Sequence, residues 1–424
     1  MIRNLDLVKD HYRRNRTIVS RDIEPMLRAI AARCELPLHL HRYTSGADIG
    51  TWIVPERWDV REAWIKDRAG RVIASYGEHP LFLVPYGRPY SGTVSKEELR
   101  RHTRLHPKRD DCFFYEHRFA YDYRLRLRDS AVTMPRERLE ALPDGHYEVH
   151  IDLDIGAGEM LVGEIVVPGE SPDSIALLAD YCHPGQVNDS FSGILAFIGV
   201  IDALKRMPRR RFTYRFLLFP ETIGSCILLQ DRPDYLQSIK LAIFSEFVGW
   251  GRNWKVLADM DRPNLAKALA VEASRKFEGL SADRLNAGYG NDEIVFDFAG
   301  VPSLSVQMTE CDEYHSSFDA PELLEQSNID RAAAIILRIC GVMERNDTYN
   351  LSQAVPFYQT RYDLYADAVT EKKLHQANRQ ILRSLRRGAD LLAIANEADC
   401  DFDHVADYAG KLVELGLAAK INER

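Results

Sequence analysis

The spacing of apolar residues differs from one part of the chain to the next and predicts different secondary structure in each. Apolar side chains recur at helical intervals over residues 18–34, which predicts an opening amphipathic helix. Between about 40 and 140, short alternating runs such as 51–54, 71–74 and 81–84 are separated by turn residues and are dense in aromatic residues, Pro and Gly. Short runs of this kind predict a small β-rich module.

From about residue 146, strand-like runs alternate with longer helical patterns. Strands are predicted at 162–167, 174–181, 212–219, 241–247 and 301–308, and helices at 192–207, 264–277 and 328–345. This alternation predicts an α/β fold in which a twisted mixed sheet is flanked by helices. Ligands of such sheets bind beyond the carboxyl ends of the strands, so functional residues are expected there.

The tail from about residue 357 carries short helical segments at 370–386, 388–396 and 402–416, followed by a short basic strand. This order is typical of a winged helix-turn-helix, although a helical cap or a dimerisation tail would give a similar pattern. We therefore expect three parts. They are an α/β domain formed by 1–40 and 141–350, an inserted β-rich domain at 41–140, and a winged helix-like domain at 357–424 through which copies of the chain could associate.

Charge changes this picture for the tail. The 424 residues include 55 Lys+Arg and 63 Asp+Glu, a net charge of -8 that argues against nucleic-acid binding as the main activity. The last tail helix and its approach are acidic, with Asp401, Asp403, Asp407 and Glu414 against Lys411. A basic cluster partly offsets them: Arg379, Arg383, Arg386 and Arg387. We expect the tail to contact protein rather than DNA.

The distribution of cysteines and of apolar runs bears on the compartment. The seven cysteines are scattered singly, a pattern typical of reduced thiols in a cytosolic protein. No apolar run approaches the roughly 18 residues that a membrane span needs, and the first residues lack an apolar signal core. These features predict a cytoplasmic protein with no membrane partner.

Polar residues follow three of the predicted strands and interrupt a fourth near its end. His183 and Asp189 come after 174–181, Glu221 after 212–219 and His315 after 301–308, while Glu246 interrupts the apolar run 241–247. Each alone could be a helix cap or a structural loop residue. Four such coincidences at one sheet edge instead favour a functional site. His102 and His106 lie among Arg and Lys residues, and we interpret them as a solvated basic face.

These residues supply two imidazoles and two or three carboxylates, with no thiolate ligand. This is the donor set of a hydrolytic Zn²⁺ that keeps an open coordination position. The chain has no Gly-x-Ser-x-Gly elbow, no Gly-x-Gly-x-x-Gly fingerprint, no Walker A loop and no HExxH motif. Burial at the end of an apolar strand would suit Glu221 to act as a base.

The order of these residues resembles that of the zinc aminopeptidase-like exopeptidase superfamily. It resembles more closely a bacterial family built from an aminopeptidase-like domain, an inserted small β-rich domain and a C-terminal winged helix. Stretches that carry the resemblance include Cys182-His183-Pro184, Pro220-Glu221-Thr222, Gly290-Asn291-Asp292-Glu293 and Tyr314-His315-Ser316.

The resemblance implies that His183, Asp189 and His315 hold the metal and that Glu221 is the general base. Glu246 matches the superfamily's later acidic ligand position, either as a fourth ligand or to orient one. Two-metal members carry two adjacent Glu residues after the second strand, whereas this chain has Thr222 in the second place, which favours a single Zn²⁺.

Asp292, Glu293 and Tyr314 flank the site in sequence and could bind a substrate amino group or the oxyanion, although loop capping explains each as well. The expected function is zinc-dependent hydrolysis of a peptide or amide bond in a small substrate. One alternative is a deacylase acting on an N-acylated sugar, an antibiotic precursor or an aminoacyl carrier. Another, of a different class, is a ligand-sensing regulator that binds DNA.

Overall fold

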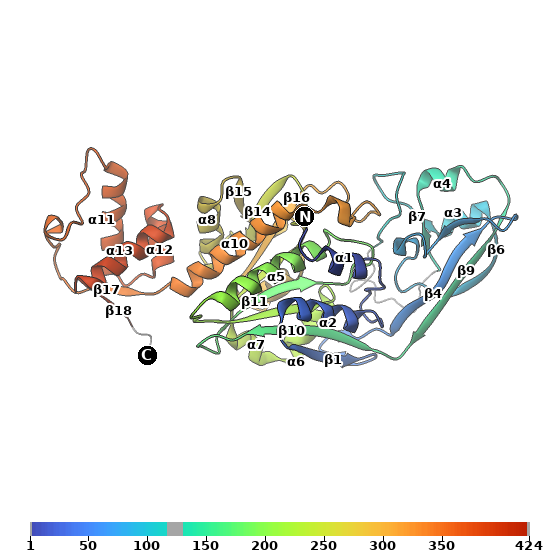
Figure 1. The fold of residues 1–424 in the computed structure, drawn as a ribbon, viewed down its shortest axis with the longest axis horizontal. Coiled ribbons are helices and arrows are strands. Elements are labelled where there is room, and N and C mark those ends of the chain that lie inside the picture. The colour runs from blue at the N-terminus through green and yellow to red at the C-terminus, as the bar shows by residue number, and fades with distance from the viewer. Residues whose placement is uncertain (1, 117–129, 422–424) are drawn as a thin grey trace. The chain divides into compact units, whose positions relative to one another are not determined.

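The computed structural model describes residues 2–116 and 130–421 and forms two compact units (Figure 1). The first unit comprises Met1–Asn253 and Tyr289–Ala333, and the second comprises Trp254–Gly288 and Ala334–Arg424. The three-part division expected from the sequence stays a prediction. None of the helices in the described ranges is long and apolar enough to cross a membrane.

The first unit begins with two helices and a set of mostly short strands. In chain order these are α1 (Leu5–His11), α2 (Ile23–Cys34), β1 (Leu38–Thr44), β2 (Asp48–Ile49), β3 (Trp52–Ile53), β4 (Arg57–Lys66), β5 (Val72–Ser75), the 3-10 helix η1 (Pro80–Phe82), β6 (Tyr90–Ser95), α3 (Lys96–His102), β7 (Thr103–Arg104), β8 (Val132–Thr133), α4 (Arg136–Glu140) and β9 (His146–Gly156). Strands β5, β4, β9 and β6 form a four-stranded sheet in that order, with antiparallel neighbours.

The rest of the first unit builds the larger sheet and its helices. These elements are β10 (Glu159–Val167), β11 (Ser174–Asp180), α5 (Phe191–Arg206), β12 (Thr213–Phe219), α6 (Ile223–Asp231), α7 (Pro233–Ser238), β13 (Ile239–Ser245), α9 (Asp292–Phe298), β16 (Ser303–Thr309) and the 3-10 helix η4 (Pro321–Leu323). The strand order is β1-β10-β12-β11-β13-β16. Helices α2 and α5 pack on one face of this sheet, and α6, α7 and α9 lie on the other (Figure 1).

Strands β12, β11, β13 and β16 run parallel to one another, whereas β10 is antiparallel to β1 and β12. Every residue of β11 and of β16 is buried, as expected for strands that are covered on both faces. The predicted α/β fold with a mixed sheet flanked by helices is confirmed.

Some predicted boundaries are wrong, and the reasons are local. The opening helix α2 begins at Ile23 rather than at residue 18, because the backbone N–H of Val19 donates to the hydroxyl of Tyr86 and its carbonyl oxygen accepts the N–H of Trp58. The apolar run 81–84 forms the 3-10 helix η1 instead of a strand, and the ring of His79 accepts the N–H of Leu81 at its start. Strand β13 ends at Ser245, so Glu246 follows the strand rather than interrupting it.

The second unit contains the tail and the segment around helix α8. Its elements are β14 (Asn253–Ala258), α8 (Leu265–Lys276), β15 (Leu280–Arg284), the 3-10 helix η3 (Leu285–Ala287), the end of α10 (Gln326–Arg345), β17 (Tyr349–Leu351), the 3-10 helix η5 (Gln359–Tyr362), α11 (Lys372–Arg386), α12 (Leu391–Ala398), α13 (Phe402–Glu414) and β18 (Ala418–Lys420). The tail helices α11, α12 and α13 pack in sequence, and β17 pairs antiparallel with β18. The winged-helix identity of this tail stays a prediction.

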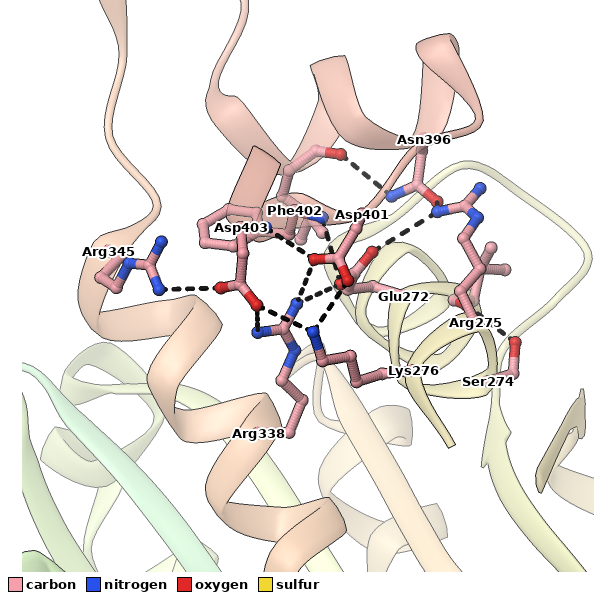
Figure 2. Close-up of polar contacts among 12 residues, drawn as sticks. Glu272, Ser274, Arg275, Lys276, Arg338, Arg345, Asn396, Asp401, Phe402 and Asp403 are labelled. Carbon is pink, nitrogen blue, oxygen red and sulfur yellow. Dashed lines mark hydrogen bonds and ion pairs between the residues drawn. The ribbon is translucent and has the colours of Figure 1, made fainter. Parts of the chain in front are cut away.

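An ion-pair network anchors the start of α13 to helices α8 and α10, as Figure 2 shows. The guanidinium of Arg338 contacts Glu272, Asp401 and Asp403, with N···O distances of 2.5, 3.1 and 2.7 Å. Lys276 pairs with the same two aspartates at 2.8 and 3.1 Å. The negative charges of Asp401 and Asp403 were the sequence's argument against DNA binding by the tail. In the structure, Arg338 and Lys276 of the same unit neutralise these charges.

Candidate metal centre

The predicted site residues lie at the carboxyl ends of four neighbouring parallel strands of the first unit. His183 and Asp189 follow β11, Glu221 follows β12, Glu246 follows β13 and His315 follows β16. Because these strands run parallel, their carboxyl ends meet at one edge of the sheet. The fold thus brings together residues that are more than 130 positions apart in the sequence.

Two histidines and one aspartate converge at this edge. The Nδ1 atom of His183 lies 3.4 Å from Oδ1 of Asp189, and Nε2 of His315 lies 3.4 Å from Oδ2 of the same carboxylate. Ligand atoms of the three residues all lie within 4.8 Å of one another. His183 and Asp189 are buried, and His315 is partly exposed.

Glu246 belongs to a neighbouring trio rather than to the one that holds both imidazoles. Ligand atoms of Asp180, Asp189 and Glu246 lie within 4.8 Å of one another, so Asp189 is shared by the two trios. The side chain of Asn291 donates a hydrogen bond to Glu246 at 3.2 Å.

Asp180, the last residue of β11, is absent from the predicted ligands, although its Oδ2 lies 3.2 Å from Nδ1 of His183. The signal that identified Glu246, an acidic residue at the end of an apolar run, applied equally to Asp180.

Glu221 stands beside the histidine trio. One of its carboxylate oxygens lies 3.4 Å from Nε2 of His183, and its backbone N–H donates to the sulfur of Cys182 at 3.1 Å. The next residue, Thr222, has φ = 62°, a strained conformation for a β-branched residue. Its N–H donates to Asp292 at 2.9 Å, and the hydroxyl of Ser225 donates to the same carboxylate. Asp292 therefore holds the turn that carries Glu221.

The local charge balance is strongly negative. Burial alone would lower the pKa of His183, but the combined charges of Asp189, Tyr115, Cys182 and Asp180 outweigh it and hold that pKa well above the usual range. Burial, reinforced by Asp189 and Asp180, raises the pKa of Glu246 well above its usual range. Burial also raises the pKa of Glu293 to about 8.

The residues present fit a zinc ion. Buried carboxylates outnumber buried cationic partners around one point, and this is the environment that a bound cation neutralises. Two imidazoles and a carboxylate are also the ligands that hydrolytic Zn²⁺ takes from proteins. His183, Asp189 and His315 would hold the ion.

Two further residues, Arg16 and Asp319, position the loops of the site. Arg16 is fully buried and donates hydrogen bonds to the carbonyl oxygens of Tyr181 and Gln186, both at 2.8 Å, and to that of His183. The carboxylate of Asp319 accepts the backbone N–H groups of 187, 188 and 189 at 2.8, 2.7 and 3.3 Å. Arg16 belongs to no local motif, so the sequence offered no signal for it, whereas Asp319 ends the stretch 313–319 that carries His315.

The region predicted as an insert also contributes to the site. The ring of Tyr115 lies 5.0 Å from that of His183 and 4.8 Å from that of His315, measured between centroids. Its backbone N–H donates to the carbonyl oxygen of His315 at 2.8 Å. Tyr115 therefore braces both candidate ligands from outside the large sheet.

A cleft of about 870 Å³ opens beside His315. Its walls include Tyr289 and Tyr314, whose rings stack at a centroid distance of 4.8 Å, and Tyr314 stacks on His315 at 3.7 Å. Of the predicted substrate-binding residues, Tyr314 lines this cleft. Asp292 and Glu293 are fully buried and are not part of its lining.

The interpretation of His106 as part of a solvated basic face is wrong. His106 is buried rather than solvated, and its ring accepts the backbone N–H groups of Lys108 and Arg109 and faces the carbonyl oxygen of Tyr314. The thiol of Cys182 also lies beside this site, because its sulfur accepts the backbone N–H of Glu221. Burial raises the pKa of that thiol to about 12. Its sulfur lies within 4.8 Å of ligand atoms of Asp180, His183 and Glu221.

The family described as "Domain of unknown function (DUF4910)" matches residues 5–346, a range that includes every candidate ligand. The chain belongs to this family. It is also 26% identical over 325 residues to a Clostridium acetobutylicum protein named "Putative polysaccharide biosynthesis protein with aminopeptidase-like domain", covering 75% of this chain and 72% of the other.

Solved structures share the fold of this DUF4910 chain. A crystal structure from Clostridium acetobutylicum, described as that of a "putative peptidase", superposes with a TM-score of 0.84 at 23% identity, covering 98% of this chain and 96% of the other. The Bacillus subtilis zinc aminopeptidase BSAP superposes with a TM-score of 0.57 at 14% identity, covering 80% and 93%. The fold is that of the zinc aminopeptidases, as the sequence resemblance predicted.

Proposed function

We propose that this chain is a zinc-dependent hydrolase of amide or peptide bonds. The observation that carries the proposal is the convergence of His183, Asp189 and His315 within 4.8 Å, with Glu221 alongside. This set stands at the sheet edge where α/β proteins bind ligands, in a fold shared with zinc aminopeptidases. No serine nucleophile motif competes with it.

A bound Zn²⁺ would supply Lewis acidity that acidifies a water molecule and polarises a carbonyl group. Glu221 takes the proton of the attacking water and delivers it to the nitrogen of the leaving amine. Asp292 keeps the carboxylate of Glu221 in place by holding the N–H of Thr222. Tyr115 packs against both histidine rings and limits the access of bulk water to them.

We propose one zinc ion per chain. Two-metal relatives in the superfamily use a carboxylate at the position of Thr222, and a threonine hydroxyl is a poor substitute for that ligand. Glu246 then lies beside the ligand set, with a carboxylate oxygen close to that of Asp189 and a hydrogen bond from Asn291.

The cleft beside His315 favours a small substrate, because its volume of about 870 Å³ lies in the usual range for small-molecule sites. A second candidate function keeps the same chemistry on an N-acylated sugar. It is favoured by the name of the Clostridium acetobutylicum relative, which refers to polysaccharide biosynthesis.

A substrate panel with metal removal tests this proposal. The purified protein is assayed on aminoacyl anilides, dipeptides and N-acetylated amino sugars, before and after chelation and after return of Zn²⁺. We expect hydrolysis of at least one amide class, loss of activity on chelation and recovery with Zn²⁺. Undiminished hydrolysis in the metal-free protein would contradict the proposal. The class with the highest kcat/KM separates the peptidase from the deacylase.

A further inference from the structure

Four arginines of the tail lie around one hollow of the second unit. Arg379, Arg383, Arg386 and Arg387 are spaced by four, three and one residues along α11 and its end, which places them on the solvent side of the helix. The opposite side of α11 is buried and packs against α12. All four arginines line a hollow with a volume of 410 Å³, called the arginine pocket below.

The charges of the arginine pocket are not neutralised by the protein. Within residues 2–116 and 130–421, none of its four arginines has an ion pair or a side-chain hydrogen bond. Other arginines of the same unit behave differently, since Arg275, Arg338 and Arg345 all pair with carboxylates. Like charges four residues apart destabilise a helix, so this arrangement favours an external anion.

The helix dipole does not account for this cluster. Cations in the last turn of a helix are stabilised by its negative end, which would explain Arg383 and Arg386. It does not explain Arg379, which lies two turns before the end. In the described part of the chain, none of these side chains donates to a helix carbonyl.

A DNA interface is less consistent with the geometry. In a helix-turn-helix, the second helix of the motif enters the major groove. Here the first residues of α13 are tied to α8 and α10 through Asp401, Asp403 and Arg338 (Figure 2). The basic residues lie instead on α11 and at its end, where all four line one hollow.

The far wall of the arginine pocket is apolar. It is formed by the segment after β17, including Val355, Pro356 and Phe357, and by Leu382 of α11. The ligand therefore needs a flat or apolar part as well as negative charge. We propose that the arginine pocket binds the diphosphate and the base of a nucleoside diphosphate.

Arginine chemistry supports this ligand class. A guanidinium grips phosphate oxygens through two parallel hydrogen bonds, so four guanidiniums suit two adjacent phosphoryl groups. The ring of Phe357 and the side chain of Pro356 offer a surface for the base. The volume of 410 Å³ lies in the range of small-molecule sites. The inference is independent of the proposed hydrolase activity.

Calorimetric titration of the full chain tests the inference. The probes are ADP, GDP and UDP, with inorganic pyrophosphate, uridine and a 20-base-pair duplex DNA for comparison. We expect saturable binding of at least one nucleoside diphosphate, tighter than that of pyrophosphate, with an affinity that falls as salt is added.

The double variant Arg383→Gln/Arg386→Gln should weaken that binding by about 10-fold or more. The matched control is Lys372→Gln/Lys373→Gln, which removes the same charge from the exposed start of α11 outside the pocket and should change the affinity by less than about 2-fold. The inference would be overturned by equal losses of affinity in both variants or by the absence of saturable binding of any nucleoside diphosphate. It would also be overturned if the duplex DNA bound more tightly than the diphosphates and lost that binding in the Arg383→Gln/Arg386→Gln variant.

Discussion

The variant Glu221→Gln should lower kcat for the best amide substrate by about 10³-fold, within the range typical of general-base catalysis. Glutamine has the shape of glutamate but cannot take a proton from water. The carboxylate of Glu221 lies 3.4 Å from the candidate ligand His183, so it is within reach of a water held at the metal. We expect KM to change little, because the group is needed in the transition state.

This variant separates catalysis from metal binding. Zinc content and thermal stability should match those of the unaltered protein, since Gln at position 221 preserves the backbone contact to Cys182. The matched control, Glu62→Gln, makes the same chemical change at an exposed position of β4 and should retain full activity. Undiminished kcat in Glu221→Gln would remove Glu221 from the mechanism.

Arg16→Met should lower the free energy of unfolding by about 3 kcal/mol, the largest loss that we expect from a residue outside the metal centre. Methionine fills much of the volume but leaves the carbonyl oxygens of Tyr181 and Gln186 buried without the Arg16 donor, and it removes one of the two donors to that of His183. The guanidinium also lies 4.5 Å from the ring centroid of Phe191, a contact that the variant loses.

Denaturant unfolding with a matched control measures this effect. Arg14→Met alters an exposed arginine two residues earlier, whose Nε donates to the carbonyl oxygen of Asp10 in the preceding turn. That control should change stability by less than about 0.5 kcal/mol. Similar stability in Arg16→Met and Arg14→Met would show that the carbonyls do not depend on Arg16.

The parts of the fold that the sequence predicted are those set by local periodicity. Every residue of strands β11 and β16 is buried because helices cover both faces of the sheet, and their mainly small and apolar runs stand out in a sequence. Helices α5 and α8 lie within a residue of their predicted limits. Because parallel strands end at the same edge of a sheet, residues that follow such strands were expected to lie close together. This is why His183, Glu221 and His315 could be predicted to meet.

The features that the sequence did not predict depend on contacts between distant segments. Arg16 supports a loop 165 to 170 residues further along the chain, and no local pattern marks it. His106 is buried because it packs under Tyr314, although its neighbours in sequence are charged. The end of a strand depends on how far it pairs with its neighbour, and β13 pairs with β16 only as far as Ser245. The sequence of a single strand does not specify this pairing, so the place of Glu246 relative to the strand could not be predicted.

The zinc content of the purified protein, determined by mass spectrometry, tests the central claim most directly. The account predicts one zinc ion per chain, retained in His102→Ala, which alters an exposed histidine, and lost in a folded His315→Ala. Circular dichroism confirms that both variants are folded. A zinc-free protein after purification in the presence of Zn²⁺, or full zinc content in His315→Ala, would contradict the account.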